Sequence, residues 1–288
     1  MSAELLAAPD KGGGLLDVLR RRELLKLIVR KELKVRYRNS VLGLLWSYVK
    51  PGVQFVVFYF ALGVFLGLNK QPNFVIYMFS GIILVNFFSE AFSNATRSVV
   101  ANGALVKKIF LPRELFPVAS VWVAVVHFLP QFLILLVACV FVGWSPSIVQ
   151  LMGAVGAFVI VAMLSLGLGL LFAAANVMFR DSENIVDLML MMATWLSPVL
   201  YAWYLVRDTL GETFYFFYQL NPMTIAVELF HFAFWAPTAA VTAAPEGARM
   251  PDNLISLWLP VGLLSALVIL AIGQTVFRRL EGRFAQEL

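Results

Sequence analysis

Long apolar segments separated by short polar ones fill most of this 288-residue chain, and this pattern constrains its fold more than any other feature. Hydrophobic residues make up 61% of the chain and charged residues only 14%, which is far from the composition of soluble domains. About 20 consecutive apolar residues cross the hydrocarbon core of a bilayer as a helix. A helix also satisfies its own backbone hydrogen bonds in lipid. We therefore expect an all-α polytopic membrane protein.

The apolar segments predict six transmembrane helices within a transmembrane domain over residues 39–288. Their expected ranges are about 52–68, 74–96, 118–142, 148–176, 185–204 and 254–276. The fifth range contains Ser197-Pro198, and because proline lacks a backbone N–H we expect a kink or break there. A polar loop over residues 97–117 joins the second and third helices.

The positions of the basic residues predict the orientation, because short basic segments beside a span remain on the cytoplasmic side. Eleven of the 22 Lys and Arg residues lie at or before Lys50. Six spans place both termini and 19 of the 22 basic residues in the cytoplasm. The apolar segment 223–235 is short for a span and contains Glu228, so we predict that it is re-entrant. It lies in an outer region over residues 205–253.

The residues before the first span predict a helix along the membrane surface at 15–38, after a flexible tail at 1–14. Its apolar and basic residues fall on opposite faces, with Leu24, Ile28 and Val35 on one and Lys26, Arg30 and Lys34 on the other. Such a helix buries its apolar face at the headgroup boundary and keeps its cations near lipid phosphates. The alternative is that these charges serve only to orient the chain.

Four polar residues share one face of the second span. They are Asn86, Glu90, Asn94 and Arg97, at spacings of four, four and three. Ionisable groups at this depth are costly and usually face protein or water. The pattern fits the lining of a hydrophilic path, a brace for the N-terminal helix, or hydrogen bonds that only hold the helices together.

Two further patterns in the spans have structural interpretations. His127 is a lone imidazole in the third span, and we expect it to be buried with its hydrogen bonds satisfied. Ser165, Gly169 and Ala173 form a small-residue face on the fourth span, which permits a close approach of another helix.

Signatures of catalysis are missing from the sequence. It contains no phosphate-binding loop of the form G-x-x-x-x-G-K-[ST], no acidic motif for Mg²⁺ and no nucleophile–base pattern. Cys139 is the only cysteine, which excludes an internal disulfide. The basic residues lie where membrane orientation requires them, so we expect no nucleic-acid binding. We also expect no enzymatic activity, no metal site and no cofactor in this chain.

Six segments resemble the motifs of one transporter family and occur in the same order. They are RYRNSVLGLLW at 36–46 followed by Pro51, LPRELFP at 111–117, NVMFRD at 176–181, SPVLY at 197–201, NPM at 221–223 and FRRLE at 277–281. The chain thereby resembles the permease subunits of ATP-binding-cassette (ABC) polysaccharide exporters, which export O antigen, teichoic acid and related lipid-linked glycans. The outer segment 237–253 departs from the family pattern by its length.

The resemblance implies a homodimeric pore in the cytoplasmic (inner) membrane of a bacterium, with membrane lipids around it. The substrate would be a polyprenyl-diphosphate-linked glycan, with an O antigen and a galactan precursor both open. Two copies of a separate cytoplasmic subunit would bind ATP and Mg²⁺ and supply the energy. The loop at 97–117 would couple to that ATPase, and the coupling residues would be Lys107, Lys108, Arg113 and Glu114.

The family also implies where the substrate is handled. The helix at 15–38 would form a cytoplasmic gate where the lipid diphosphate comes in, and the region 205–253 would form outer gate helices. The gate residues would be Arg36, Tyr37, Arg38 and Trp46, although the arginines also serve to orient the chain. The channel-lining candidates are Asn86, Glu90, Phe58, Phe87, Phe88, Trp195 and Tyr201. The aromatic residues among them are explained equally well if their bulky side chains face the membrane lipid and not a channel.

Three other function classes fit the sequence less well than an ABC polysaccharide exporter does. The runner-up is the permease of an ATP-driven drug or lipid exporter of the same superfamily, which would lack the motif at 36–46. A secondary transporter would show internal repeats, and we find none. An enzyme acting on polyprenyl phosphate would need the missing acidic motifs.

Overall fold

The computed structural model describes residues 14–38, 40–41, 43–65, 67, 72–108, 111–242 and 250–288. The flexible tail expected at 1–14 lies outside this part except for Gly14. All regular structure in the described ranges is helical, and no strand occurs there. The predicted all-α class is therefore confirmed for these ranges.

Four of the described helices are long and apolar enough to cross a membrane. They are α4 (Phe74–Ala101), α6 (Leu115–Phe141), α7 (Ile148–Met178) and the helix formed by η7 (Leu254–Trp258) with α12 (Leu259–Leu280). The 27 residues of α6 make a helix about 40 Å long. The predicted spans at 74–96, 118–142, 148–176 and 254–276 match these helices closely.

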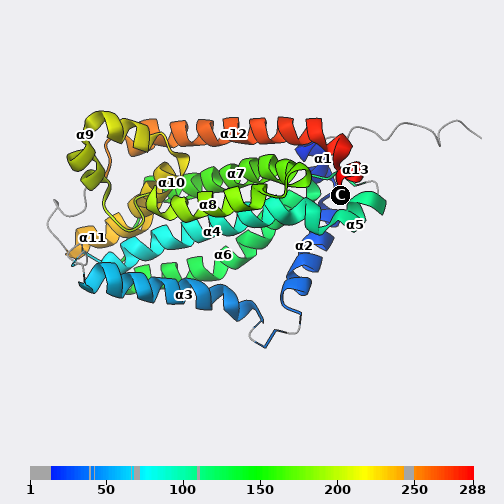
Figure 1. Ribbon diagram of the computed structural model, residues 1–288. Helices are drawn as coiled ribbons and strands as arrows, with labels where there is room; N and C mark the ends of the chain where they lie inside the picture. Colours follow the sequence, from blue (N-terminus) through cyan, green and yellow to red (C-terminus); the bar gives the residue numbers. More distant parts are fainter. Residues whose placement is uncertain are drawn as a thin grey trace, which may run out of the picture.

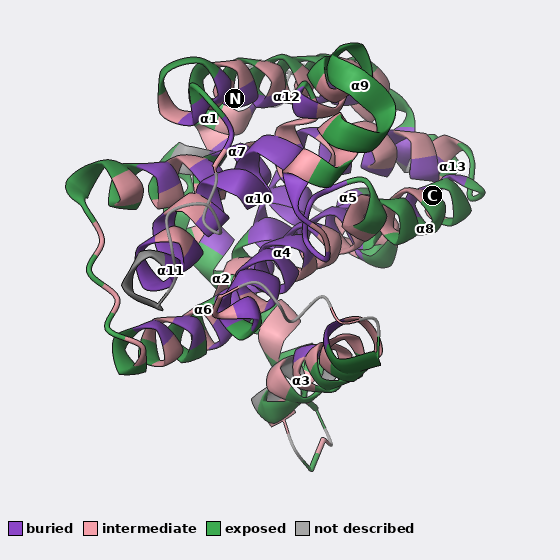
Figure 2. Ribbon diagram, turned by 90° about the vertical axis from the view of Figure 1, so that its left-hand side faces the viewer, coloured by how far each residue is buried: buried purple, intermediate pink, exposed green. Residues whose placement is uncertain are grey.

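The centre of the bundle is α4, which packs against both α6 and α7, while α12 packs along the other side of α7 (Figures 1 and 2). Small residues allow these close approaches. A Cβ atom built on Gly273 would lie 2.0 Å from the carbonyl oxygen of Gly167, and one on Gly169 would lie 2.5 Å from the Cβ of Ala95. The predicted close approach at Gly169 is thus confirmed, whereas the crossing of Gly167 and Gly273 was not predicted.

The predicted first and fifth spans correspond to shorter helices. The first contains α3 (Trp46–Phe58) and the π-helical η3 (Tyr59–Phe65), and its predicted end at residue 68 lies outside the described residues. The fifth contains α8 (Ser182–Trp195), which ends just before Ser197-Pro198. The expected break is present, since residues 196–202 are not helical, so the predicted range up to residue 204 is not one continuous helix.

Residues 203–242 form a second set of shorter helices, at one end of the bundle (Figure 1). These are α9 (Trp203–Gln219), α10 (Pro222–Phe230), the π-helical η5 (His231–Trp235) and α11 (Ala236–Thr242). We call residues 222–242 the α10 segment. All of α10 after Pro222 is buried, since it packs against α4, α7 and α12. The bundle end that holds α9 and α11 is called the α9 end below.

The opposite end of the bundle, called the α2 end, holds five short helices. They are α1 (Leu15–Arg20), α2 (Arg22–Arg36), α5 (Gly103–Lys108), η8 (Glu281–Arg283) and α13 (Phe284–Glu287). Figure 1 shows α2 running across the long axis of the bundle, as expected of a surface helix. Both Gly14, which lies beside Gln274 and Arg278, and the C-terminus are at this end.

The predicted helix at 15–38 is present but is interrupted at Arg21. Val18, Leu25 and Ile28 are buried, and α2 packs against α6. Val35 is 61% exposed, so it does not join Ile28 on the side that packs against the bundle. The three basic residues predicted for the other face, at 26, 30 and 34, are exposed as expected.

Candidate functional site

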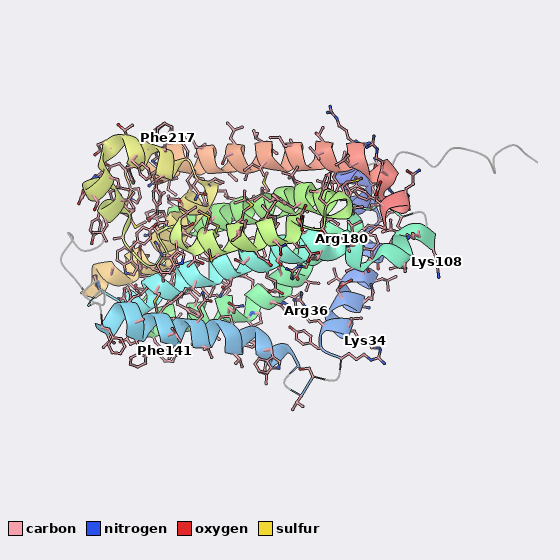
Figure 3. The ribbon with its side chains drawn as sticks, viewed as in Figure 1. Lys34, Arg36, Lys108, Phe141, Arg180 and Phe217 are labelled. Carbon is pink, nitrogen blue, oxygen red and sulfur yellow. The ribbon has the colours of Figure 1, made fainter. Side chains whose placement is uncertain are left out.

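A polar cluster joins the end of α2 to α4 and α6, and we call it the Arg36 cluster (Arg36, Tyr37, Glu90 and His127). The Arg36 guanidinium donates to the Glu90 carboxylate. His127 Nδ1 lies 2.5 Å from the same carboxylate oxygen, and His127 Nε2 lies 2.7 Å from the Tyr37 hydroxyl. Both ring nitrogens therefore have partners. Figure 3 shows Arg36 pointing into the bundle and Lys34 pointing away from it.

The Arg36 cluster supports one of the interpretations left open for the polar face of α4, the brace for the N-terminal helix. Glu90 braces the N-terminal helix, because its carboxylate is the common partner of a cation from α2 and an imidazole from α6. The His127 side chain is 3% exposed, which confirms the expected buried and satisfied histidine. Its pairing with Tyr37 was not predicted, since residues 90 positions apart share no local pattern.

A small polar cavity of about 120 Å³ adjoins the Arg36 cluster between α2, α4 and α6. Its lining includes Glu32, Arg36, Asn94, Arg97, Asn102 and Ser120. Asn102 also hydrogen-bonds to Lys31 and Glu32, so a second contact ties the middle of α2 to the end of α4. Asn86 lies deeper on the same face, and its buried Nδ2 has no partner among the described residues.

Arg97 makes a second ionic contact at the α2 end, between α4 and α8. Its guanidinium lies 3.1 Å from Glu183 Oε2 and 3.2 Å from Asp187 Oδ1. Glu183 also accepts from Asn176 of α7 at 2.9 Å. Asp181, at the start of α8, makes no side-chain cap hydrogen bond. Through Arg97 and Asn176, the acidic residues Glu183 and Asp187 connect α8 to α4 and α7.

The predicted coupling loop contains the short helix α5, whose two lysines, Lys107 and Lys108, are exposed (Figure 3). Behind α5 lies the C-terminal segment, with Leu288 next to Gly103. Arg113 lies over the ring of Phe284, with its Cζ 5.7 Å from the ring centroid.

Glu114 belongs to the interior of the subunit and not to its surface. It is 0% exposed, and Gln274 of α12 donates to its Oε1 at 3.1 Å. Because Gln274 of α12 covers the carboxylate, Glu114 does not present it to a partner in this conformation, and its place at or beside the coupling contact stays a prediction.

The predicted gate and lining residues fall into an exposed and a buried group. Arg38, Trp46 and Trp195 are exposed, and Phe58 is half-buried on α3. Phe87 and Phe88 are only 2% and 5% exposed. Phe87 stacks on Phe158 of α7 at 5.0 Å between centroids. A glycan passing outside the subunit cannot reach the two phenylalanines, so the prediction that they line its path is corrected.

The α10 segment is held by an aromatic stack that sequence patterns did not reveal. Tyr77 of α4 stacks on His231 at 3.8 Å between centroids and meets Trp235 edge-on at 5.0 Å. The Tyr77 hydroxyl donates to the carbonyls of Pro198 and Tyr201, at 2.9 and 2.7 Å. Tyr77 of α4 thus holds both the non-helical residues after α8 and the start of η5 in place.

Nothing in the described ranges forms a metal centre, since no group of three or more His, Cys, Asp or Glu side chains comes together there. The pair Glu228 and His231 is buried on consecutive turns of the α10 segment. Glu228 Oε1 has no partner among the described residues. The ion pairs that join different helices in the described part lie at the α2 end, whereas Arg207 pairs with Asp208 and Glu212 within α9.

Comparison with known proteins places this arrangement in a family. Two O-antigen export system permease proteins RfbA from Klebsiella pneumoniae are each 26% identical over 266 residues, which cover 92% of this chain and 95% of theirs. The O-antigen export system permease protein RfbA of Myxococcus xanthus is 29% identical over 238 residues, 82% of this chain and 89% of that protein. The ABC-2 type transporter family matches residues 23–235, from the start of α2 to the end of η5. The chain therefore belongs to the ABC-2 type transporter family.

Proposed function

We propose that this chain is the permease subunit of an ABC exporter that moves a polyprenyl-diphosphate-linked polysaccharide across the cytoplasmic membrane. The observation that carries the proposal is similarity over 92% of the chain to permease proteins of O-antigen export systems. The motif at 36–46, which the sequence shares with polysaccharide exporters, forms part of the Arg36 cluster. An O antigen and a galactan precursor are both candidate cargoes.

The proposed topology has six crossings with both termini in the cytoplasm. The four long helices supply four of them, and the shorter helices α3–η3 and α8 supply the first and the fifth. Gly14 and the C-terminus lie at one end of the bundle, which supports an even number of crossings. The α2 end is then cytoplasmic, and the α10 segment is re-entrant from the outer side.

The proposed energy source is a separate ATPase subunit that binds ATP and Mg²⁺. Two permease copies and two ATPase copies form the exporter, and α5 with Lys107 and Lys108 makes the contact. Both lysines are exposed and lie next to each other at the tip of the α2 end. Such a surface favours an acidic groove on the partner.

Replacing Lys107 and Lys108 together by Glu tests this contact. We expect the ATPase no longer to co-purify with the permease, because the charge at the contact is reversed. The unfolding of the permease should not change, since both side chains are exposed. The single substitution of exposed Lys34 by Glu is the matched control. Unchanged co-purification and unchanged ATPase stimulation in the double variant would refute the contact.

The proposed cytoplasmic gate is the end of α2, with Arg36, Tyr37, Arg38 and Trp46. The Arg36 side chain is 36% exposed and is hydrogen-bonded to the Glu90 carboxylate. Glu90 also contacts His127, so it would still have a partner without Arg36. A diphosphate offers the guanidinium stronger, bidentate hydrogen bonds than one carboxylate oxygen does. Arriving substrate therefore draws Arg36 away from Glu90, and α2 loses its brace on the bundle.

The proposed glycan path lies at the interface of two subunits. Its candidates on this chain are Phe58, Trp195 and Tyr201, together with Asn86 and Glu90 at the cytoplasmic mouth. Trp195 is 56% exposed, and the Tyr201 hydroxyl donates to its carbonyl at 2.7 Å. Aromatic faces of this kind stack on sugar rings without reading one particular sugar.

Depletion of the protein in its own bacterium tests the function. We expect polyprenyl-diphosphate-linked glycan to accumulate on the cytoplasmic side of the membrane, and the surface glycan to decline. Restoring the wild-type chain should reverse both changes. The absence of any accumulating lipid-linked glycan would overturn the proposal in favour of another ATP-driven exporter class.

A further inference from the structure

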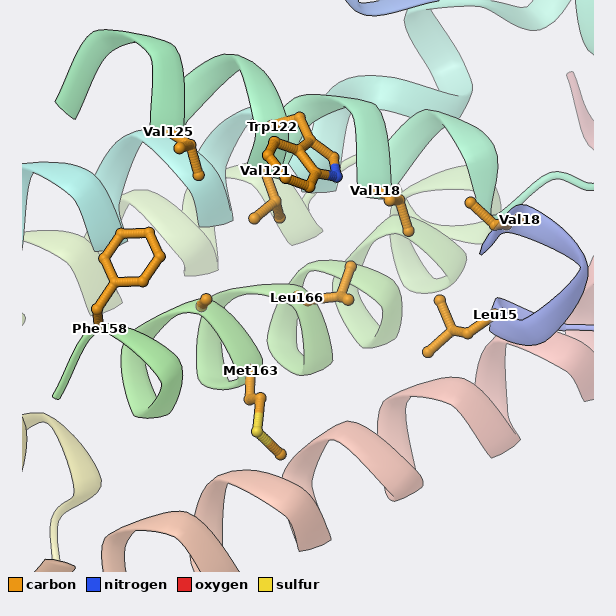
Figure 4. A pocket seen from close by; sticks show the side chains of 10 residues that line it. Leu15, Val18, Val118, Val121, Trp122, Val125, Phe158, Met163 and Leu166 are labelled. Atoms are coloured by element: carbon orange, nitrogen blue, oxygen red, sulfur yellow. The ribbon is translucent and has the colours of Figure 1, made fainter. Parts of the chain in front are cut away.

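An apolar groove of about 340 Å³ lies between α6 and α7 and is bounded at one end by α1 (Figure 4). Leu15 and Val18 come from α1, Val121 and Trp122 from α6, and Phe158 and Ala162 from α7. The ten lining residues are all apolar or aromatic. From Val118 to Val125 the groove follows about 10 Å of α6.

The groove exists because α6 and α7 each pack closely on α4 but make few contacts with each other. Its lining includes short side chains such as Val118, Val121 and Ala162. Water would find no polar partners there, and an empty groove would forfeit dispersion contacts along its whole length. A flexible hydrocarbon chain needs no polar partners and would supply the dispersion contacts along the groove.

The groove is separate from the Arg36 cluster, because the two lie on opposite faces of α6. At 100° per residue, Val118, Val121, Trp122 and Val125 share one face of the helix. Ser120, Val123 and His127, which face the polar cavity or the Arg36 cluster, share the other. A ligand in the groove therefore does not compete with a substrate held by Arg36.

Exposed arginines occur in and next to α1, the helix that bounds one end of the groove. Arg20 is the last residue of α1 and Arg22 the first of α2; both are exposed, and neither forms an ion pair among the described residues. Arg278 of α12 lies beside Gly14 at the start of α1. Arg21, in contrast, is paired with Asp17 at 3.2 Å. The positive charge at one end of an apolar groove complements a lipid with an anionic headgroup.

We propose that the groove binds one acyl chain of an anionic membrane phospholipid, with its phosphate at Arg20 and Arg22. The bound lipid fastens α1 to α6 and α7 and so anchors the N-terminal end of α2. The occupant is a phospholipid and not the polyprenyl carrier, since the carrier's diphosphate is drawn to Arg36 on the other face of α6. This inference does not depend on which glycan the protein exports.

Lipid retention by the purified full-length permease with its partner subunit tests the site. The probe is phosphatidylglycerol in mild detergent, with phosphatidylcholine as the neutral competitor, and bound lipid is measured by native mass spectrometry. We expect Ala162→Phe, which fills the groove, to lose the retained phosphatidylglycerol. Val155→Phe is the matched control, because Val155 is 65% exposed on the same helix outside the groove. Equal retention by both variants overturns the proposal.

The headgroup contribution is tested by Arg20→Gln and Arg22→Gln, neither of which alters the groove itself. Each should weaken the preference for phosphatidylglycerol over phosphatidylcholine about fivefold, because a cation near the membrane surface contributes about 1 kcal/mol to binding an anionic lipid. An unchanged preference in both variants overturns the assignment of the phosphate.

A fluorescence measurement does not depend on the folding of Ala162→Phe. Phosphatidylglycerol with brominated chains should quench Trp122 at a low mole fraction, and Trp122→Phe should remove that component. If the quenching of Trp122 instead rises in proportion to the mole fraction of any brominated lipid, whatever its headgroup, the result contradicts a specific site. Displacement of phosphatidylglycerol by an equal amount of polyprenyl phosphate, or cross-linking of two copies through position 122, would assign the groove to another occupant and overturn the proposal.

Discussion

The two ends of the bundle are held together by different kinds of contact. Near the α9 end, the α10 segment is buried among α4, α7 and α12, and aromatic rings and apolar side chains fill its surroundings. At the α2 end, Leu25 and Ile28 of α2 also join a buried apolar cluster, but the contacts that tie α2 and α8 to α4 include partly exposed ion pairs. Buried apolar packing costs several kcal/mol to disrupt, whereas partly exposed ion pairs contribute about 1 kcal/mol or less each. The ion-paired contacts at the α2 end are therefore the ones expected to separate more easily.

This difference between the two ends fits the roles proposed for them in export. A gate that admits a charged lipid head must open in response to modest forces, and exchangeable ion pairs allow that. The α10 segment, in contrast, is attached to α4 through Tyr77, His231 and Trp235, so it moves only with the helix that carries it.

Phe234→Ala should have the largest effect on stability. Phe234 is 1% exposed, and its ring lies 5.0 to 5.5 Å from the rings of Phe132, Trp144 and Phe230. Its truncation leaves a cavity and should lower the free energy of unfolding by about 3 to 5 kcal/mol. Thermal unfolding in detergent measures this change. Phe217→Ala, at a position 65% exposed on α9, is the control and should change little.

Arg97→Ala should have an intermediate effect. It removes contacts to Glu183 and Asp187, both partly exposed, and should cost about 1 to 2 kcal/mol in unfolding free energy. Because the contacts join α4 to α8, hydrogen exchange should rise in α8 and not in the α10 segment. A loss as large as that of Phe234→Ala would contradict the proposed contrast between the two ends.

Arg36→Ala should have the smallest effect on stability, about 1 kcal/mol or less, because Glu90 keeps its contact with His127. Hydrogen exchange in α2 should nevertheless increase, and high salt should reduce the difference from wild type. Arg38→Ala is the control, since the exposed Arg38 side chain makes no ion pair among the described residues. If Arg38→Ala released α2 as readily as Arg36→Ala, Glu90 would not be its brace.

The sequence predicted the elements whose signal is local. Apolar runs located α4, α6, α7 and α12 within a few residues, and Ser197-Pro198 located the end of α8. The same local reasoning gave a brace for the N-terminal helix as one of three roles of the polar face that holds Glu90, because charge at that depth requires a partner.

What the sequence did not reveal depends on contacts between distant segments. In helices that are apolar all round, periodicity does not show which face meets a neighbour. For that reason Phe87 and Phe88 were placed on a channel and not in the core, and the stack of Tyr77 on His231 was missed. The groove between α6 and α7 was missed too, since it arises from the different directions of two spans.

The most direct test of the contrast between the two ends is hydrogen exchange in the complete transporter, measured with and without ATP and lipid-linked substrate. We predict that exchange in residues 22–36 increases several-fold when substrate and ATP are both present, while residues 222–235 remain protected. Faster exchange in the α10 segment than in α2, or an α2 that remains fully protected through turnover, would contradict the account.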